Sequence, residues 1–169
     1  MLIIGVLRHL AAIVVLPFTV TVVVPLWLLR RSHTAIGLGS TPADLAVQGG
    51  GIAVLSVGLL LFAASLRRFA VQGQGTLAPW DPPRRLVVSG PYRFVRNPMI
   101  AGVIFILIGE ALVLRSTPHA WWAAVFALIN VVYFMAFEEP QLERRFGDSY
   151  REYKRHVRRI VPRLRPWDP

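Results

Sequence analysis

The residues with the most evident chemistry are two neighbouring carboxylates, Glu138 and Glu139, which follow directly after the apolar stretch 120–137. Carboxylates are unexpected there, because the C-terminus of a helix favours cations. A carboxylate can accept hydrogen bonds from an ammonium group or a sugar diol. Near lipid its pKa is expected to be raised, so Glu139 is also a candidate base for an amine or hydroxyl substrate.

A basic group precedes the third apolar stretch, where Arg93, Arg96 and Asn97 come directly before Pro98. Arginine binds carboxylates and phosphates through two parallel hydrogen bonds. The third and fourth apolar stretches are joined by a few residues only, which predicts an antiparallel pair of helices. The basic group and the two carboxylates would then meet at one end. This arrangement suits a small zwitterion with hydroxyl groups, and a structural salt bridge would have the same geometry.

Four apolar stretches could position these groups, and each predicts a membrane-spanning helix. They are residues 10–29, 45–66, 98–115 and 120–137. A bilayer core of about 30 Å needs about 20 apolar residues in a helix, and a backbone in lipid must satisfy its own hydrogen bonds. The third stretch is long enough if it begins at Pro98 and Arg115 extends to the interface. We therefore predict a single all-α integral membrane domain over residues 1–169.

The first stretch follows Arg8, as the apolar part of a secretory leader would. It is long for a leader, and no cleavage site with small residues follows it. We expect this stretch to remain as a span.

The composition agrees with a membrane protein, since 54% of the 169 residues are apolar and 17% are charged. Soluble domains have roughly 45–50% and 25%, and disordered chains lack such an apolar content. The chain has no cysteine, which excludes disulfides, thiolate nucleophiles and thiolate metal sites. Its four histidines lack metal-ligand spacing, so we predict no metal site.

The charge distribution predicts the orientation. With four spans, sixteen of the 19 basic residues lie on the side that holds both termini and the segment 67–97. The positive-inside rule places that side in the cytoplasm. We expect a multi-pass protein of the bacterial cell membrane whose partners are the lipid bilayer and a lipophilic substrate, and no nucleic acid, although the net charge is +10.

Two segments on the predicted cytoplasmic side have sequence patterns that the positive-inside rule alone does not explain. The segment 67–97 is rich in glycine, proline and aromatic residues, which favours an ordered loop over a flexible connector. It ends in Asn97 and Pro98, a typical helix start.

The tail 138–169 predicts an amphipathic helix, because apolar side chains recur along one face. They are Leu142, Phe146, Tyr150, Tyr153, Val157 and Ile160. Gly147 predicts a break, and Ser149 with Glu152 has the spacing of a capping box that restarts the helix. A helix lying on the membrane surface would explain this pattern, but not the adjacent carboxylates.

Glu110 lies inside the third apolar stretch, and a carboxylate within a membrane is a functional candidate. It is close to Arg115 and far from Glu138 and Glu139. We favour a role at the interface or in helix pairing.

Three motifs in series resemble the isoprenylcysteine carboxyl methyltransferase and phospholipid methyltransferase superfamily. They are G-P-Y-R-F-V-R-N-P-M-I-A-G at 90–102, E-E-x-x-L-x-x-x-F-G-x-x-Y-x-x-Y-x-x-x-V-x-R at 138–159, and the glycine- and proline-rich run that begins at Gly73. They occur in the right order and spacing and cover roughly half of the chain.

The resemblance implies an integral-membrane enzyme that transfers a methyl group from S-adenosylmethionine to the carboxyl, amine or hydroxyl group of a membrane-soluble acceptor at the cytoplasmic face. Carried over to this sequence, the cofactor-binding residues are Tyr92, Arg93, Asn97, Pro98, Glu138 and Glu139. Arg96 and Glu139 are the catalytic candidates. Asn97 stands where many members have histidine, and Ile100 where many have tyrosine, so the acceptor cannot be copied from the family.

Other classes remain open. A relative that lost activity would serve as a membrane binding or assembly protein and would not bind S-adenosylmethionine. A lipid reductase of related architecture would bind a nicotinamide cofactor instead. A small transporter generally needs a polar group near the bilayer midplane, and we expect none apart from Glu110. The sequence names neither the acceptor nor the oligomeric state.

Overall fold

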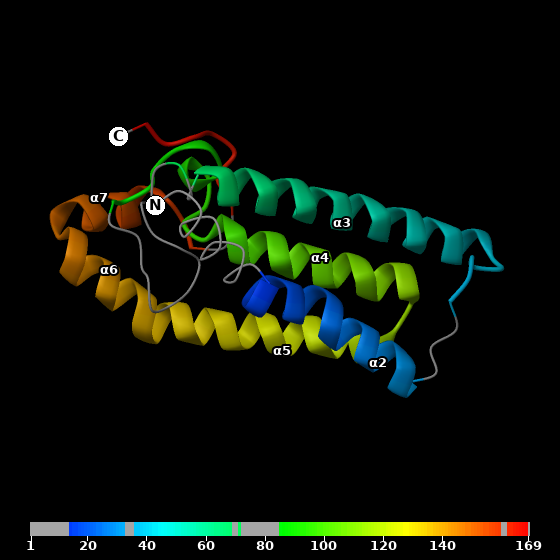
Figure 1. The fold of residues 1–169 in the computed structure, drawn as a ribbon. Coiled ribbons are helices and arrows are strands. Elements are labelled where there is room, and N and C mark those ends of the chain that lie inside the picture. Colours follow the sequence, from blue (N-terminus) through cyan, green and yellow to red (C-terminus); the bar gives the residue numbers. More distant parts are fainter. Residues whose placement is uncertain (1–13, 33–35, 69–70, 72–84, 160–161, 169) are drawn as a thin grey trace.

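The computed structural model describes residues 14–32, 36–68, 71, 85–159 and 162–168, and the regular secondary structure in these ranges is helical (Figure 1). In chain order the elements are the π-helix η1 (Val14–Val23), α2 (Val24–Ser32), α3 (Pro42–Arg68), the 3₁₀ turn η3 (Gly90–Arg93), α4 (Pro98–Leu114), α5 (Thr117–Tyr133), the π-turn η4 (Phe134–Glu138), α6 (Glu139–Phe146) and α7 (Asp148–His156). The predicted all-α class is confirmed for this part of the chain.

Two helices are long and apolar enough to cross a membrane: α3, and the continuous helix Thr117–Phe146 formed by α5, η4 and α6. Only 17% and 11% of their most apolar windows are buried in the protein. Large apolar surfaces are therefore exposed, whereas a helix in the core of a water-soluble protein would bury them. Helix α4 is apolar but has 17 residues. The predicted span 10–29 begins outside the described residues and continues as η1 and α2.

Helices α3 and α4 pack side by side through glycines (Figure 1). Gly51 and Gly58 on α3 are seven residues apart, as are Gly102 and Gly109 on α4, so each pair lies on one helix face. A Cβ atom on Gly58 would lie 2.7 Å from the amide nitrogen of Ile106 and 2.8 Å from the carbonyl oxygen of Gly102. Small residues let the two backbones approach closely in a membrane. We call these four glycines the glycine seam.

The first helical segment is held against α5 by two polar side chains. The Nε2 atom of buried His119 lies 3.1 Å from the carbonyl oxygen of Pro25, and its Nδ1 atom lies 2.7 Å from Ser116 Oγ. Trp122 Nε1 donates to the carbonyl oxygen of Val20 at 3.1 Å. These bonds place η1 and α2 beside α5.

At the far end of the glycine seam, Arg115 Nη1 lies 2.9 Å from Asp44 Oδ1. Arg115 ends α4 in a left-handed conformation, with φ 48°. Glu110 Oε2 is buried and has no hydrogen-bond partner within the described residues. Within the described residues, this oxygen therefore makes no hydrogen bond that would support the expected role of Glu110 in helix pairing.

The C-terminal helices fold back onto the end where α4 begins (Figure 1). Gly147 separates α6 from α7 with φ 54°, as predicted. The predicted capping box is wrong, because α7 starts earlier, at Asp148, and has no side-chain cap. The buried residues Tyr150, Tyr153 and Val157 form a cluster with half-buried side chains from other segments, namely Leu86, Val88, Leu142, Phe146 and Trp167. The apolar face of this region thus packs against the protein itself.

Candidate functional site

Two local features bring the predicted site residues together at the end where α4 begins. Asn97 caps α4, since its Oδ1 accepts a hydrogen bond from Ile100 N at 3.4 Å, and buried Pro98 is the first helical residue, as predicted. The π-turn η4 then interrupts the long helix directly before Glu139, whose amide donates to the carbonyl oxygen of Phe134. Such π segments inside α-helices frequently occur at functional sites.

Glu139 is buried, with 4% of its surface exposed, and three cations bind its carboxylate. Arg96 Nη1 lies 2.9 Å from Oε1. Arg159 donates from Nε to Oε1 at 2.7 Å and from Nη2 to Oε2 at 3.0 Å. Lys154 Nζ lies 3.4 Å from Oε2. The predicted meeting of Arg96 and Glu139 is confirmed, and we call these four residues the ionic cluster.

The charge state of Glu139 follows from these contacts. Burial alone would raise its pKa, but the hydrogen bond from Arg159 and the charges of Arg96, Arg159 and Lys154 outweigh this effect and lower the pKa. Glu139 is therefore ionised at neutral pH. A carboxylate that has a low pKa and uses both oxygens on cations is a poor base, so the geometry favours Glu139 as an anchor for the cations.

The neighbouring Glu138 has the opposite electrostatics. It lies just beyond Phe137, the last residue of the apolar stretch. Burial raises the pKa of Glu138 to about 7, and the negative charge of Glu139 adds to this effect. Glu138 forms no ion pair with a residue that the structure describes. A cationic group of a bound ligand would supply the missing counterion.

Three buried hydrogen-bond donors at this end have no partner within the described ranges: the Tyr92 hydroxyl, Arg96 Nε and Arg163 Nη1. Two of them, those of Tyr92 and Arg96, belong to predicted site residues. Burial raises the pKa of Tyr92, and electrostatic interactions with Tyr153 and Glu138 add to this effect. Arg96 Nη1 also donates to the Tyr150 hydroxyl at 3.4 Å. An unpaired buried donor is costly, so these two donors indicate where a ligand oxygen could bind.

Arg93 does not join the glutamates. Its Nε donates to the carbonyl oxygen of Trp167 at 2.9 Å, and its Nη2 pairs with Asp168. The Trp167 amide donates back to the carbonyl oxygen of Arg93 at 3.0 Å, and Arg163 N donates to that of Phe94 at 2.9 Å. The expectation that Arg93 faces the glutamate pair is wrong, because the C-terminal segment binds its side chain instead.

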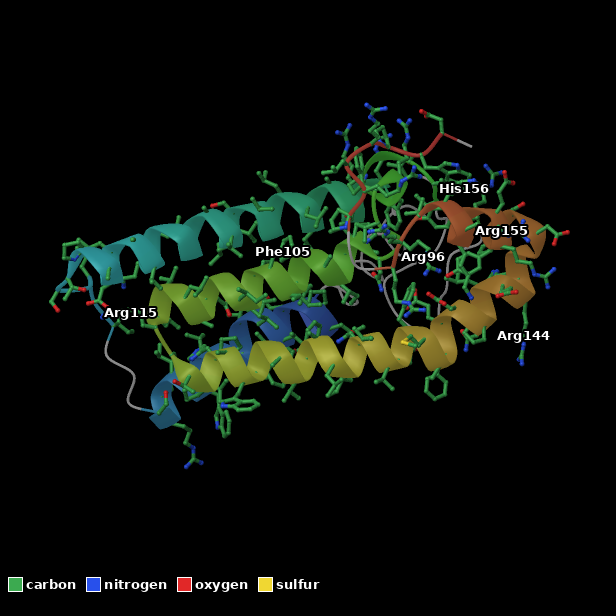
Figure 2. All side chains as sticks on the ribbon, turned by 180° about the vertical axis from the view of Figure 1, so that it is seen from behind. Arg96, Phe105, Arg115, Arg144, Arg155 and His156 are labelled. Atoms are coloured by element: carbon green, nitrogen blue, oxygen red, sulfur yellow. The ribbon has the colours of Figure 1, made fainter. Side chains whose placement is uncertain are left out.

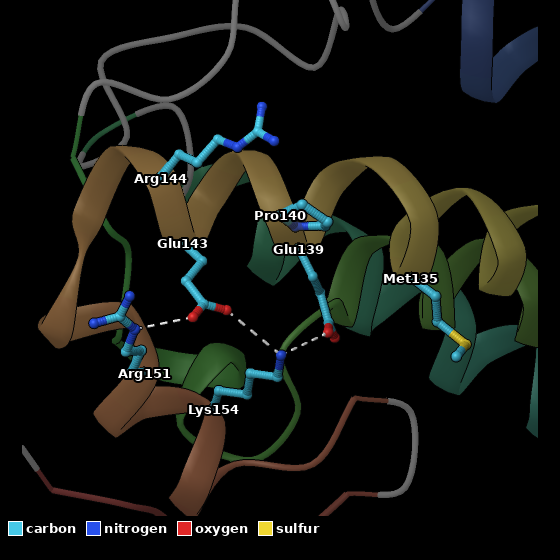
Figure 3. Close-up of a pocket in the computed structure, with 7 residues that line it drawn as sticks. All are labelled: Met135, Glu139, Pro140, Glu143, Arg144, Arg151 and Lys154. Atoms are coloured by element: carbon cyan, nitrogen blue, oxygen red, sulfur yellow. Dashed lines mark hydrogen bonds and ion pairs between the residues drawn. The ribbon is translucent and has the colours of Figure 1, made fainter.

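An open pocket of about 310 Å³ lies beside Glu139 (Figure 3). It is lined by Met135, Glu139, Pro140, Glu143, Arg144, Arg151 and Lys154. Figure 3 shows Lys154 reaching between two carboxylates, with Nζ 3.4 Å from Glu139 Oε2 and 3.6 Å from Glu143 Oε2. Arg151 Nε donates to Glu143 Oε1 at 2.9 Å. The volume is at the lower end of small-molecule sites, which range from about 300 to 1,000 Å³.

A second recess, of about 20 Å³, lies between α4 and α5. It is lined by Asn97, Ile100, Ala101, Ile104, Asn130, Val131, Phe134 and Arg159. Glu139 lines the larger pocket and Arg159 lines the recess. Because these two side chains bind each other, their ion pair lies between the two spaces.

A family model described as "Phospholipid methyltransferase" matches residues 48–149, which include α4, α5 and the glutamate pair. The chain belongs to the phospholipid methyltransferase family. The first half of the ionic cluster, Arg96 and Glu139, lies inside the matched range, whereas Lys154 and Arg159 follow it.

Two curated relatives share part of this family region. Methanethiol S-methyltransferase 2 of Bradyrhizobium diazoefficiens is 37% identical over 76 residues, covering 43% of this chain and 27% of the relative. Methanethiol S-methyltransferase 1 of the same organism is 38% identical over 71 residues, covering 42% and 24%. The chain thus aligns with about a quarter of the length of these relatives. No solved structure matches the chain significantly.

Sequence reasoning missed several residues that line these spaces. Lys154 and Arg159 were counted only as part of the basic charge, although Arg159 closes the motif 138–159. Asn130 was overlooked, although it is an amide inside an apolar stretch. The expectation that the apolar stretches offer no polar group near the bilayer midplane apart from Glu110 is therefore wrong, because Asn130 lies near the middle of the stretch 120–137. The run 72–84 of the upstream motif lies outside the described residues.

Proposed function

We propose that this chain is an S-adenosylmethionine-dependent methyltransferase that acts on a membrane-soluble acceptor at the cytoplasmic face. The observation that carries the proposal is the buried ionic cluster at Glu139, which has unpaired donors and a carboxylate of raised pKa beside it. Membership of a methyltransferase family makes methyl transfer the reaction to test first.

The residues at this end fit the chemical groups of S-adenosylmethionine. The Tyr92 hydroxyl and Arg96 Nε would donate to its carboxylate. Glu138 would pair with its ammonium group or accept from its ribose hydroxyls. Asn97 and Pro98 would line the site at the start of α4, and Arg93 would act indirectly by fastening the preceding turn to the C-terminal segment.

S-adenosylmethionine, when bound, supplies a methyl group on a sulfonium, which is already an activated leaving group. The chain itself has to orient the reactants and exclude water. In our proposal Glu139 holds the three cations of the ionic cluster in place, and Arg96 is the catalytic residue that contacts the ligand. The apolar surroundings of the recess exclude water on the acceptor side.

The acceptor and the membrane arrangement are parts of the same proposal. The names of the two relatives add a thiol to the carboxyl, amine and hydroxyl acceptors that the sequence suggests. We propose four spans, formed by η1 with α2, by α3, by α4 and by α5, in a bacterial cell membrane with both termini cytoplasmic. Figure 2 supports this orientation, because Arg96, Arg144 and Arg155 gather at one end and Arg115 lies at the other.

The test uses the full chain purified in detergent. S-adenosylmethionine binding is measured by calorimetry, and transfer of a labelled methyl group is measured with a bacterial lipid extract. We expect binding and transfer by the wild type and by Glu152→Gln, an exposed control on α7, and loss of both in Glu139→Gln.

Two results would contradict the proposal. A folded wild type that does not bind S-adenosylmethionine would favour the non-catalytic binding or assembly protein. Binding of a nicotinamide cofactor instead would favour the lipid reductase.

A further inference from the structure

The recess between α4 and α5 contains the amide side chain of Asn130, at a position in the sequence where a membrane span ordinarily has an apolar side chain. Asn130 lies in the apolar stretch 120–137, and polar residues within membrane spans are costly and often functional. Its Nδ2 donates to the carbonyl oxygen of Phe126 at 2.9 Å. Its Oδ1 accepts no hydrogen bond from a residue that the structure describes, and so remains available to a ligand.

The recess borders the ionic cluster on one side and the apolar span on the other. Asn130 precedes Glu138 by eight residues, which is about 12 Å along a helix. Arg159 lines the recess and donates to Glu139 at 2.7 Å. Leu128, Ile129 and Val132, neighbours of Asn130 on α5, are exposed apolar side chains. An apolar molecule from the bilayer could therefore approach Asn130 along α5.

We propose that this recess binds the reacting end of the methyl acceptor, and that Asn130 selects an uncharged thiol or hydroxyl at that end. The inference rests on the proposed function and specifies its substrate class. The acceptor would be a lipid-soluble molecule whose apolar part lies along α5 and whose single polar atom lies beside Asn130. Methyl transfer would join the methyl carbon to the acceptor sulfur or oxygen, break the methyl–sulfonium bond to leave S-adenosylhomocysteine, and release the acceptor's proton to solvent water.

Size and charge exclude the larger headgroups. A cavity of about 20 Å³ holds about one water-sized group, which suits a thiol or hydroxyl and is too small for a carboxylate or phosphate. The lining consists of two amides, five apolar side chains and Arg159, whose Nε and Nη2 are already bound to Glu139. An ammonium would be buried beside Arg159 without a counterion, which is strongly unfavourable, and a carboxylate would have to compete with Glu139 for Arg159. An asparagine Oδ1 can accept a hydrogen bond from a neutral thiol or hydroxyl.

The test compares hexanethiol, 1-hexanol, hexanoate and hexylamine as acceptors of a labelled methyl group. We expect the wild type to methylate hexanethiol or hexanol and not hexanoate or hexylamine. Asn130→Leu should raise KM for the accepted substrate about tenfold, as loss of one buried hydrogen bond predicts. It should leave the Kd for S-adenosylmethionine within about twofold, since among the described residues Asn130 hydrogen-bonds to Phe126 and to none of the groups proposed to bind the cofactor.

Ser56→Ala is the matched control. Ser56 also donates to the carbonyl oxygen four residues earlier, Ile52 O at 2.8 Å, but it lies on the exposed face of α3. Its substitution should leave KM unchanged. Calorimetric binding of 1-hexanol in the presence of S-adenosylhomocysteine gives a second readout that needs no turnover, and Asn130→Leu should weaken it because the hydroxyl loses its acceptor.

If Asn130→Leu fails to fold, Asn130→Gln replaces it, because the longer amide keeps the polar group but fills the recess. Preference for hexanoate or hexylamine, or an unchanged KM and hexanol affinity in a folded Asn130 variant, would overturn the inference and assign the amide a structural role. These results are distinguishable from failure of the proposed function, in which the wild type does not bind S-adenosylmethionine.

Discussion

The glycine seam and the ionic cluster hold the molecule together by different means. In the seam, α3 and α4 touch through backbone atoms, and a single added carbon would collide with the opposite helix. In the ionic cluster, the segments that meet at Glu139 are joined by charge. The seam sets how α4 lies against α3, and the cluster holds the side chains that can bind a ligand. The effect of a substitution should therefore depend on side-chain volume in the seam and on side-chain charge in the cluster.

The largest effect is expected from Gly58→Leu in the seam. Its Cβ would lie 2.7 Å from a backbone nitrogen, which no rotamer change can relieve, and overpacking costs about 1–3 kcal/mol even where side chains can adjust. We expect almost no folded protein, as measured by size-exclusion chromatography in detergent.

Gly50→Ala is the control for that substitution, because a Cβ there meets nothing within 4 Å. It should be neutral or stabilise α3 by about 0.5–1 kcal/mol. Normal yield and thermal stability of Gly58→Leu would show that the two helices do not approach as closely as the seam requires.

The next largest effect is expected from Glu139→Gln in the ionic cluster. The substitution keeps the volume but leaves the cluster's cations without their anion, and removal of one partner from a buried ion pair costs about 3–5 kcal/mol. The midpoint of thermal unfolding should fall clearly. Glu143→Gln removes a more exposed carboxylate that also contacts Lys154, and its effect should be much smaller because exposed ion pairs are screened by water and salt. Equal shifts in the two variants would contradict the distinction between buried and exposed pairs.

The parts that local chemistry determines were predictable from the sequence. Asn97 and Pro98 start α4, and Gly147 ends α6, because caps and breaks depend on neighbouring residues. The meeting of Arg96 and Glu139 was also predictable, since a short connection makes the two apolar helices antiparallel.

The other partners of Glu139 could not be predicted in the same way. Lys154 and Arg159 reach it only because the chain folds back after Gly147, and basic residues in a cytoplasmic tail are ordinarily explained by topology alone. Arg93 was misplaced for the same reason, since its partner Trp167 lies 74 residues away in sequence. The charge pattern indicated a site, but not which cations belong to it.

A smaller effect, confined to ligand binding, is expected from Arg159→Gln. Arg159 donates two hydrogen bonds to Glu139, whereas neighbouring Arg158 has an exposed side chain. We expect the affinity for S-adenosylmethionine to fall about tenfold in Arg159→Gln, equivalent to one charged hydrogen bond. Arg158→Gln should remain within about twofold of the wild type. If calorimetry gave the same affinity for both variants, Arg159 would have no role in binding S-adenosylmethionine.

The smallest effect at neutral pH concerns Glu138. Its pKa of about 7 in the free protein means that half of the molecules carry a protonated carboxyl there. Because only the ionised form would attract a cationic ligand, the affinity for S-adenosylmethionine should rise as the pH increases through 7. At one pH unit below this pKa, the affinity for S-adenosylmethionine should be about tenfold lower than its constant value at high pH. Glu138→Gln should flatten this profile, and a wild-type affinity independent of pH between 6 and 8 would contradict the proposed pairing.

In our proposal the ionic cluster, rather than any surface along the glycine seam, borders the site of S-adenosylmethionine. Ultraviolet cross-linking of labelled S-adenosylmethionine to the full chain, with excess S-adenosylhomocysteine as competitor, locates that site by peptide mapping. We expect competed label in peptides that contain residues 92–98 or 138–159. Competed label confined to peptides of α2 or α3 would place the cofactor elsewhere and overturn the proposal.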